Sequence, residues 1–116
     1  MSNDLQVRTT ERDGAAVVTP RGDVDLSCSP VLRDALMEAL DGSPRSLIVD
    51  MQGVGSIDSS GLATLIESMR ETQARGIPLV LCAATTRVRA VFEIARLDSV
   101  FTLVDDVDAA MDAGTP

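Results

Sequence analysis

The chain has 116 residues, of which 45% are hydrophobic, and it carries a formal net charge of −8 without any histidine. This length suits one domain with a real hydrophobic core, and the hydrophobic share excludes a disordered chain. The absence of histidine and lysine excludes a Ser-His-Asp triad, a Schiff-base lysine and a phosphate-loop lysine, and the acidic balance argues against binding to nucleic-acid backbones or anionic membranes.

The beginning of the chain predicts two antiparallel strands. Residues 5–9 alternate between apolar and polar side chains, which indicates a half-exposed strand. The pair Asp13-Gly14 is a hairpin turn signal. Residues 15–19 are therefore predicted as the returning strand, which we expect Pro20 to end.

An amphipathic helix is predicted next. Apolar residues recur at helical spacing over residues 31–40, and Pro30 suits the first helical turn. Ser27 or Ser29 is the expected N-terminal cap, and Gly42 is expected to end the helix.

The second half of the chain alternates short apolar runs with helical patterns. Residues 46–51 are typical of a strand covered on both faces, and Gly53 and Gly55 indicate a pliable loop after it. A helix is predicted from near Asp58 to Gly76. The remaining predictions are a strand over 78–83, a helix that opens at Thr85 or Thr86, a strand over 101–104, and a terminal helix capped by Asp105 or Asp106 and running through Met111.

This order of elements predicts an α/β fold with a mixed sheet of four to five strands packed with about four helices. Nothing reads as a repeat or an interdomain linker, so we expect one domain over residues 1–116 with an ordered core over about 5–112. Residues 1–4 are not followed by the basic region and apolar run of a signal peptide, so we expect none. Cys28 and Cys82 are too far apart for a metal or redox motif, and they fit two free thiols in a reducing cytoplasm.

The segment from Ile57 to Leu62 joins a buried strand to an amphipathic helix. Asp58 is the expected N-cap, which places Ser59 at the first helical position with its hydroxyl toward solvent. Gly61 is expected to let the backbone of a partner approach closely. Residue types alone leave two interpretations open: a simple helix cap, or a modification site at which a phosphate on Ser59 adds a charge of about −1.5 to −2.

The sequence gives weaker support to other candidate functional sites. Gly53-x-Gly55 lacks the third glycine of a dinucleotide-binding loop. The acidic run over 105–108 is better explained as a capped terminal helix than as a metal site. Arg87 and Arg89 begin a helix, where cations are unfavourable, and they either face solvent or face a partner. We therefore expect no catalytic residue, no metal site and no cofactor.

The motif Asp58-Ser59-Ser60-Gly61-Leu62, at a strand-to-helix junction in a chain this short, resembles the STAS domain. More narrowly, it is similar to the bacterial anti-sigma factor antagonists, also called anti-anti-sigma factors. Gly22-Asp23-Val24-Asp25 matches their segment after the second strand, and the stretch from Val91 to Leu97, with Phe101, resembles their third helix and last strand. The resemblance covers nearly the whole chain. Ala63 departs from it, because many members carry a second glycine there.

The resemblance implies a cytoplasmic regulator that is not an enzyme. In this family the serine directly after the motif's aspartate, here Ser59, is phosphorylated by the anti-sigma factor, a serine kinase of the histidine-kinase-like ATPase fold. The unmodified antagonist binds the anti-sigma factor and releases the sigma factor. Phosphorylation ends the binding, and a metal-dependent serine phosphatase restores it. The residues expected to surround the phosphosite and to bind the partner are Asp23, Asp25, Asp58, Ser60, Gly61 and Leu62.

The same fold serves other roles, which remain alternatives. One is a STAS regulatory subunit of a membrane transporter of the ABC type. Another is a component of a stress-signalling assembly. Under each of these interpretations we expect neither direct binding to nucleic acid nor insertion into a membrane, because cations are few and the longest apolar stretch is too short to span a bilayer.

Overall fold

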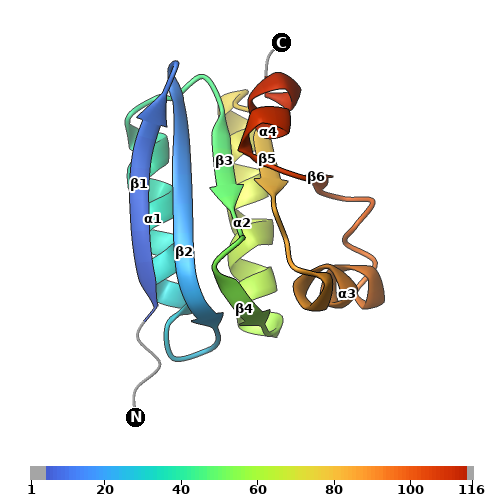
Figure 1. Cartoon of the computed structure of the whole chain (residues 1–116). Helices are drawn as coiled ribbons and strands as arrows, with labels where there is room; N and C mark the ends of the chain where they lie inside the picture. The colour runs from blue at the N-terminus through green and yellow to red at the C-terminus, as the bar shows by residue number, and fades with distance from the viewer. Residues whose placement is uncertain (1–4, 115–116) are drawn as a thin grey trace.

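The computed structural model describes residues 5–114, in which helices alternate with strands after an initial hairpin (Figure 1). Residues 1–4, where a signal peptide was not expected, and residues 115–116 lie outside the described residues. The strands are β1 (Gln6–Arg12), β2 (Ala15–Val24), β3 (Leu47–Asp50), β4 (Val54–Ile57), β5 (Leu79–Cys82) and β6 (Thr102–Val104). The helices are α1 (Ser29–Asp41), α2 (Ser59–Arg75), α3 (Thr86–Ile94) and α4 (Val107–Ala113).

The strands form a mixed sheet in the order β1-β2-β3-β5-β6, and β4 also pairs with β2. Strands β1 and β2 are antiparallel, whereas the other pairs are parallel. The predicted α/β class, with a mixed sheet and four helices, is confirmed within residues 5–114. The same residues form six strands, one more than the upper end of the predicted range.

The additional strand is β4, where the glycines had indicated a loop. Strand β2 is long enough to pair with two strands in succession, with β3 over 16–18 and with β4 over 22–24. A Cβ added to Gly55 would lie 2.8 Å from Oδ1 of Asp23. Glycine therefore marks a close approach between two strands here, and not a pliable loop.

Strand β2 also continues through Pro20, which had been expected to end it. The N–H of Ala16 donates to the carbonyl of Ser46 at 3.0 Å, and that of Gly22 donates to the carbonyl of Gly53 at 2.9 Å. Even-numbered residues of β2 thus donate toward β3 and β4. Position 20 falls between the segment paired with β3 and the segment paired with β4. The missing N–H of proline therefore removes no hydrogen bond from the sheet.

Several local signals lead to the predicted turns and helix ends. Asp13 and Gly14 have φ angles of 52° and 85°, as a two-residue hairpin turn requires. Gly76 ends α2 with a φ of 69°, and Asp106 caps α4. These features depend on residues close together in the sequence, and their predictions are confirmed.

The expected cap of α1 is wrong. The N-cap is Cys28, and no side chain caps this helix. Ser27 lies one residue before the N-cap, and its hydroxyl donates to Oδ1 of Asp25 at 2.6 Å. The N–H of Ser29 is instead satisfied by the backbone carbonyl of Asp25 at 2.8 Å. A backbone turn therefore takes the place of a capping side chain at this helix.

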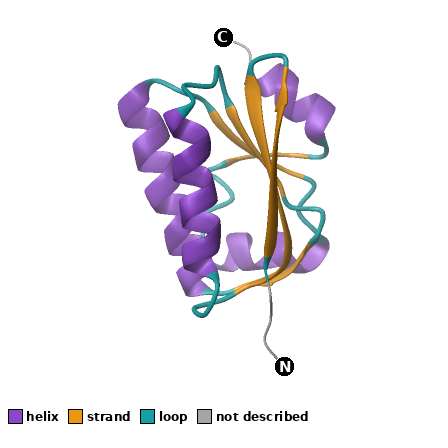
Figure 2. Ribbon diagram, turned by 90° about the vertical axis from the view of Figure 1, so that its left-hand side faces the viewer, coloured by secondary structure: helices purple, strands orange, loops and turns teal. Residues whose placement is uncertain are grey.

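Helices cover both faces of the sheet (Figure 2). Helices α1 and α2 lie side by side on one face, and α4 packs on the other face against β3 and β5. Helix α3 packs near β4. The larger core includes Val18, Leu36, Val49, Leu65 and Phe92, all of them buried. The smaller core, under α4, consists of Ala15, Val17, Ile48, Val80, Cys82 and Ala110.

The end of β2, the start of α1 and the start of α2 lie at one end of the molecule, opposite the hairpin turn (Figure 1). The motif singled out in the sequence lies at this end.

Candidate functional site

The start of α2 is organised by the carboxylate of Asp58. Its Oδ1 accepts hydrogen bonds from the N–H groups of Ser60 at 2.9 Å and Gly61 at 3.1 Å, and from the hydroxyl of Ser60 at 2.5 Å. The predicted N-cap is thereby confirmed. Since amides of the first helical turn have no partner within the helix, this carboxylate satisfies two groups that would otherwise need water.

These contacts also determine the ionisation of Asp58. Its pKa is lowered, chiefly because the Ser60 hydroxyl donates to it, with further contributions from the N–H groups of Gly61, Ser60 and Leu26. Partial burial opposes the shift and is the smaller effect. The helix tip therefore carries a negative charge at neutral pH, directly beside Ser59.

The two serines of the motif have different surroundings. Ser59 occupies the first helical position and is exposed. Among the contacts of the described residues, the hydroxyl of Ser59 makes no hydrogen bond, whereas that of Ser60 donates to Asp58 and Ser60 is only half-buried. The hydroxyl of Ser59 is therefore open to solvent, whereas that of Ser60 is hydrogen-bonded within the chain.

The loop between β2 and α1 lies against this helix tip. Oδ2 of Asp58 accepts a hydrogen bond from the N–H of Leu26 at 3.2 Å. Oδ1 of Asp25 accepts from the N–H of Ser27 at 3.0 Å and from its hydroxyl at 2.6 Å. The structure thereby brings Asp25 and Asp58 to neighbouring segments. Asp23 lies on the last part of β2, beside Gly55 of β4.

Gly61 and Leu62 face inward. Gly61 is buried, and a Cβ there would lie 2.6 Å from Cγ1 of Ile57 and 2.8 Å from Cγ1 of Val24. The glycine therefore lets α2 pack onto the sheet, in contrast to the expectation that it admits a partner's backbone. Leu62 belongs to the larger core. Both residues support the helix tip from beneath.

Sequence reasoning missed Leu26, which stands at the same end of the molecule with 77% of its surface exposed. Its signal in the sequence is slight: one large apolar residue between Asp25 and Ser27, in a turn. Only the hydrogen bond to Asp58 shows that this residue adjoins the motif.

Both thiols are free, as predicted, and both are buried. Sγ of Cys28 donates to the carbonyl of Asp23 at 3.1 Å beneath the loop, and burial raises the pKa of this thiol. Cys82 lies in the smaller core, where burial, together with the charges of Asp50 and Asp106, raises its pKa to about 12. Neither thiol has the exposure or the lowered pKa of a reactive cysteine.

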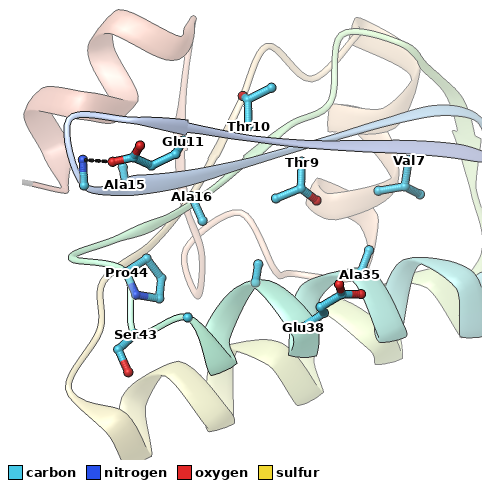
Figure 3. A pocket seen from close by; sticks show the side chains of 13 residues that line it. Val7, Thr9, Thr10, Glu11, Ala15, Ala16, Ala35, Glu38, Ser43 and Pro44 are labelled. Atoms are coloured by element: carbon cyan, nitrogen blue, oxygen red, sulfur yellow. Dashed lines mark hydrogen bonds between the residues drawn. The ribbon is translucent and has the colours of Figure 1, made fainter.

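A groove of about 720 Å³ opens elsewhere, between the β1–β2 hairpin and α1 (Figure 3). It contains the carboxylates of Glu11 and Glu38, and that of Glu11 accepts a hydrogen bond from the N–H of Gly14 at 3.1 Å. The groove lies toward the hairpin turn, away from Ser59. Within residues 5–114, no three potential metal-ligating side chains come together, and no helix is long and apolar enough to cross a membrane.

The mixed sheet, the four helices of residues 5–114 and the Asp58 cap at the start of α2 agree with a STAS domain. The chain belongs to the STAS domain family, which matches residues 6–110. It is similar to the anti-sigma-F factor antagonist RsfB of Mycobacterium tuberculosis, with 23% identity over 109 residues that cover 94% of this chain and 88% of that protein.

Solved structures lead to the same class. An anti-sigma factor antagonist from Mycobacterium paratuberculosis matches with a TM-score of 0.87 and 25% identity, over 96% of this chain and 94% of that one. SpoIIAA of Bacillus in its phosphorylated form matches with a TM-score of 0.70 and 21% identity, over 95% and 98% of the two chains, and shares the fold. The resemblance to anti-sigma factor antagonists is thereby confirmed. Such antagonists are non-enzymatic regulators that partner with anti-sigma factors.

Proposed function

We propose that this chain is an anti-sigma factor antagonist whose unmodified form binds an anti-sigma factor and releases the sigma factor, and that phosphorylation of Ser59 ends the binding. The observation that carries this proposal is the exposed hydroxyl of Ser59 at the tip of a helix that Asp58 already caps. Ser60 is the less accessible site for phosphorylation, because it is half-buried and its hydroxyl donates a hydrogen bond to Oδ1 of Asp58 at 2.5 Å.

The partner we propose is a serine kinase of the histidine-kinase-like ATPase fold, which is itself the anti-sigma factor. Such a kinase supplies the nucleotide, the metal ion and the catalytic base, so the antagonist contributes only a positioned hydroxyl. A metal-dependent serine phosphatase would return the chain to its binding form, and both reactions would take place in the cytoplasm. The similarity to RsfB, and to a protein of this fold that is known in a phosphorylated form, supports this proposal.

Electrostatics explains how the switch would work. A phosphate on Ser59 adds a charge of about −1.5 to −2 beside the ionised Asp58. The start of α2 favours that charge by only about 0.3–1 kcal/mol. A surface that fits the unmodified helix tip would have to accommodate the new charge, and disrupting a close charged contact costs about 2–5 kcal/mol. A cost of about 2 kcal/mol already weakens a complex about thirtyfold.

Three variants test the proposal: Ser59→Ala, Ser59→Asp and the control Ser60→Ala. We expect Ser59→Ala and Ser60→Ala to capture a histidine-kinase-like anti-sigma factor from a lysate of the source bacterium, and Ser59→Asp to lose it. With the purified kinase and ATP, we expect Ser59→Ala to resist phosphorylation while Ser60→Ala accepts it.

Equal capture of the anti-sigma factor by Ser59→Ala and Ser59→Asp would contradict the switch. Capture of the same membrane transporter by both variants would favour a transporter subunit and return Ser59 to the role of a helix residue.

A further inference from the structure

The β2–α1 loop, residues 25–28, holds a large apolar side chain in water beside the helix tip. Leu26 is 77% exposed, and its neighbours in the loop are polar or buried. Isolated exposed leucines are ordinary on protein surfaces. Leu26 differs from them because its backbone is tied on both sides.

The ties are hydrogen bonds to two carboxylates and to a buried thiol. Asp58 accepts the N–H of Leu26 at 3.2 Å, and Asp25 accepts both the N–H and the hydroxyl of Ser27. Sγ of Cys28 accepts a hydrogen bond from the N–H of Asp25 at 3.5 Å. The backbone of the loop is therefore held in place before any partner arrives, so the loop loses little conformational freedom on binding.

Asp58 connects this loop to the phosphosite. Its Oδ1 caps α2, while its Oδ2 holds Leu26, a residue 32 positions earlier in the chain. One carboxylate thus positions the exposed hydroxyl of Ser59 and the exposed side chain of Leu26 at the same end of the molecule.

We propose that Leu26 is the apolar anchor of the surface that binds the anti-sigma factor, inserted into an apolar hollow of that partner, and that Asp58 is its positioning residue. This inference rests on the proposed function and names the chemistry of recognition at the same site. A few residues in well-packed pockets near the centre of an interface carry most of its binding energy, and an aliphatic side chain in a pocket can be such an anchor. Because the loop and the helix tip are acidic, we expect cationic side chains around the hollow.

The position of Leu26 also strengthens the switch. A phosphate on Ser59 would place a strongly hydrated charge beside a side chain that must lose its water to bind. Phosphorylation would therefore oppose burial of Leu26, a cost separate from the need of the partner surface to accommodate the new charge. The free chain would keep its fold, because Leu26 contributes little to the core.

The test measures binding to the purified anti-sigma factor that the Ser59→Ala variant captures. We expect Leu26→Ala to bind at least about tenfold more weakly, and Leu26→Met to bind within about threefold of the parent, because it keeps the volume. The matched control is Val100→Ala. Val100 is likewise an exposed apolar residue, at 49%, but it lies with Thr72 and Gln73 near the other end of α2.

A second variant isolates the positioning role. Asp58→Asn keeps one oxygen for the cap, since asparagine caps helices as well as aspartate does, but its amide group cannot accept the N–H of Leu26. We expect faster hydrogen exchange at the Leu26 amide, an unchanged midpoint of urea unfolding within about 0.5 M, and weaker binding to the partner.

The outcomes separate the two proposals. If Ser59→Asp loses binding while Leu26→Ala binds within twofold of the parent, the anchor is wrong and the switch stands. If Val100→Ala weakens binding as much as Leu26→Ala does, the apolar contact is not specific and the anchor is again wrong. If Ser59→Asp still binds, the proposed function itself fails.

Discussion

Removing the carboxylate of Asp58 should weaken the fold measurably, although the side chain is exposed. In Asp58→Ala, the amides of Ser60 and Gly61 lose their cap, which costs about 0.5–2 kcal/mol. The N–H of Leu26 also loses its acceptor, and the net cost of that lost hydrogen bond is about 0.5–1.5 kcal/mol. We expect a total of about 1–3.5 kcal/mol at pH 7. With an m value of about 1–3 kcal/mol/M, the urea midpoint should fall by about 1 M.

The pH dependence gives this prediction a second signature. Because the pKa of Asp58 is lowered in the folded chain, ionised Asp58 stabilises the fold above its ordinary pKa. That contribution is lost as the pH falls through the lowered pKa. The difference between the parent and Asp58→Ala should thus be full at pH 7 and shrink progressively below about pH 4.

Urea unfolding, followed by circular dichroism at several pH values, measures both quantities, with Asp58→Asn as the control. The Asp58→Asn variant should retain most of the stability at pH 7, since an amide oxygen can cap the helix. A midpoint for Asp58→Ala equal to that of the parent at pH 7, or a difference that does not change with pH, would refute the assignment of Asp58 as the organising group of this site.

Three further predictions concern the cores and a helix end. Phe92→Ala should destabilise the chain by about 3–5 kcal/mol, because Phe92 is fully buried and its ring packs edge to face on Phe101 at 5.7 Å; a smaller loss than about 2 kcal/mol in urea would contradict this packing. Cys28 and Cys82 should react with a thiol reagent at pH 8 at least about a hundredfold more slowly in the native chain than in urea, and a fast native phase would show an exposed thiolate. Gly76→Ala should cost about 1 kcal/mol, because the φ of 69° is left-handed while space for a Cβ is open, and calorimetry showing no loss would place the strain elsewhere.

The sequence predicted most of the elements because their signals are local. The hairpin turn at Asp13-Gly14 and the start of α2 at Asp58 each depend on residues within a few positions. The prediction was wrong where a proline or a glycine is compatible with both a strand and a loop. Pro20 stays inside β2 because it lies opposite the gap between β3 and β4, where no neighbouring strand would accept a hydrogen bond from its nitrogen. Gly55 belongs to a strand because Val54 and Ile57 on either side of it pair with β2.

Some features of the candidate site could also be predicted from local patterns, whereas others depend on packing. Local capping rules place Ser59 at the first helical position, and the motif's resemblance to anti-sigma factor antagonists singles it out. The inward role of Gly61 follows from Ile57 and Val24, and Val24 lies on β2, far from it in the chain. Proximity of that kind is a result of packing, which no pattern in a single sequence records.

Local sequence patterns were enough to predict the alternation of strands and helices, the cap at Asp58 and the position of Ser59, since each follows from periodicity or from contacts between near neighbours. Two features are visible only in the folded chain: β2 pairs with two strands in succession, and the amide of Leu26 donates to Asp58, 32 positions away. Both depend on how the loops close and how the helices pack on the sheet. The global free energy of the fold, and not any local preference, selects those arrangements.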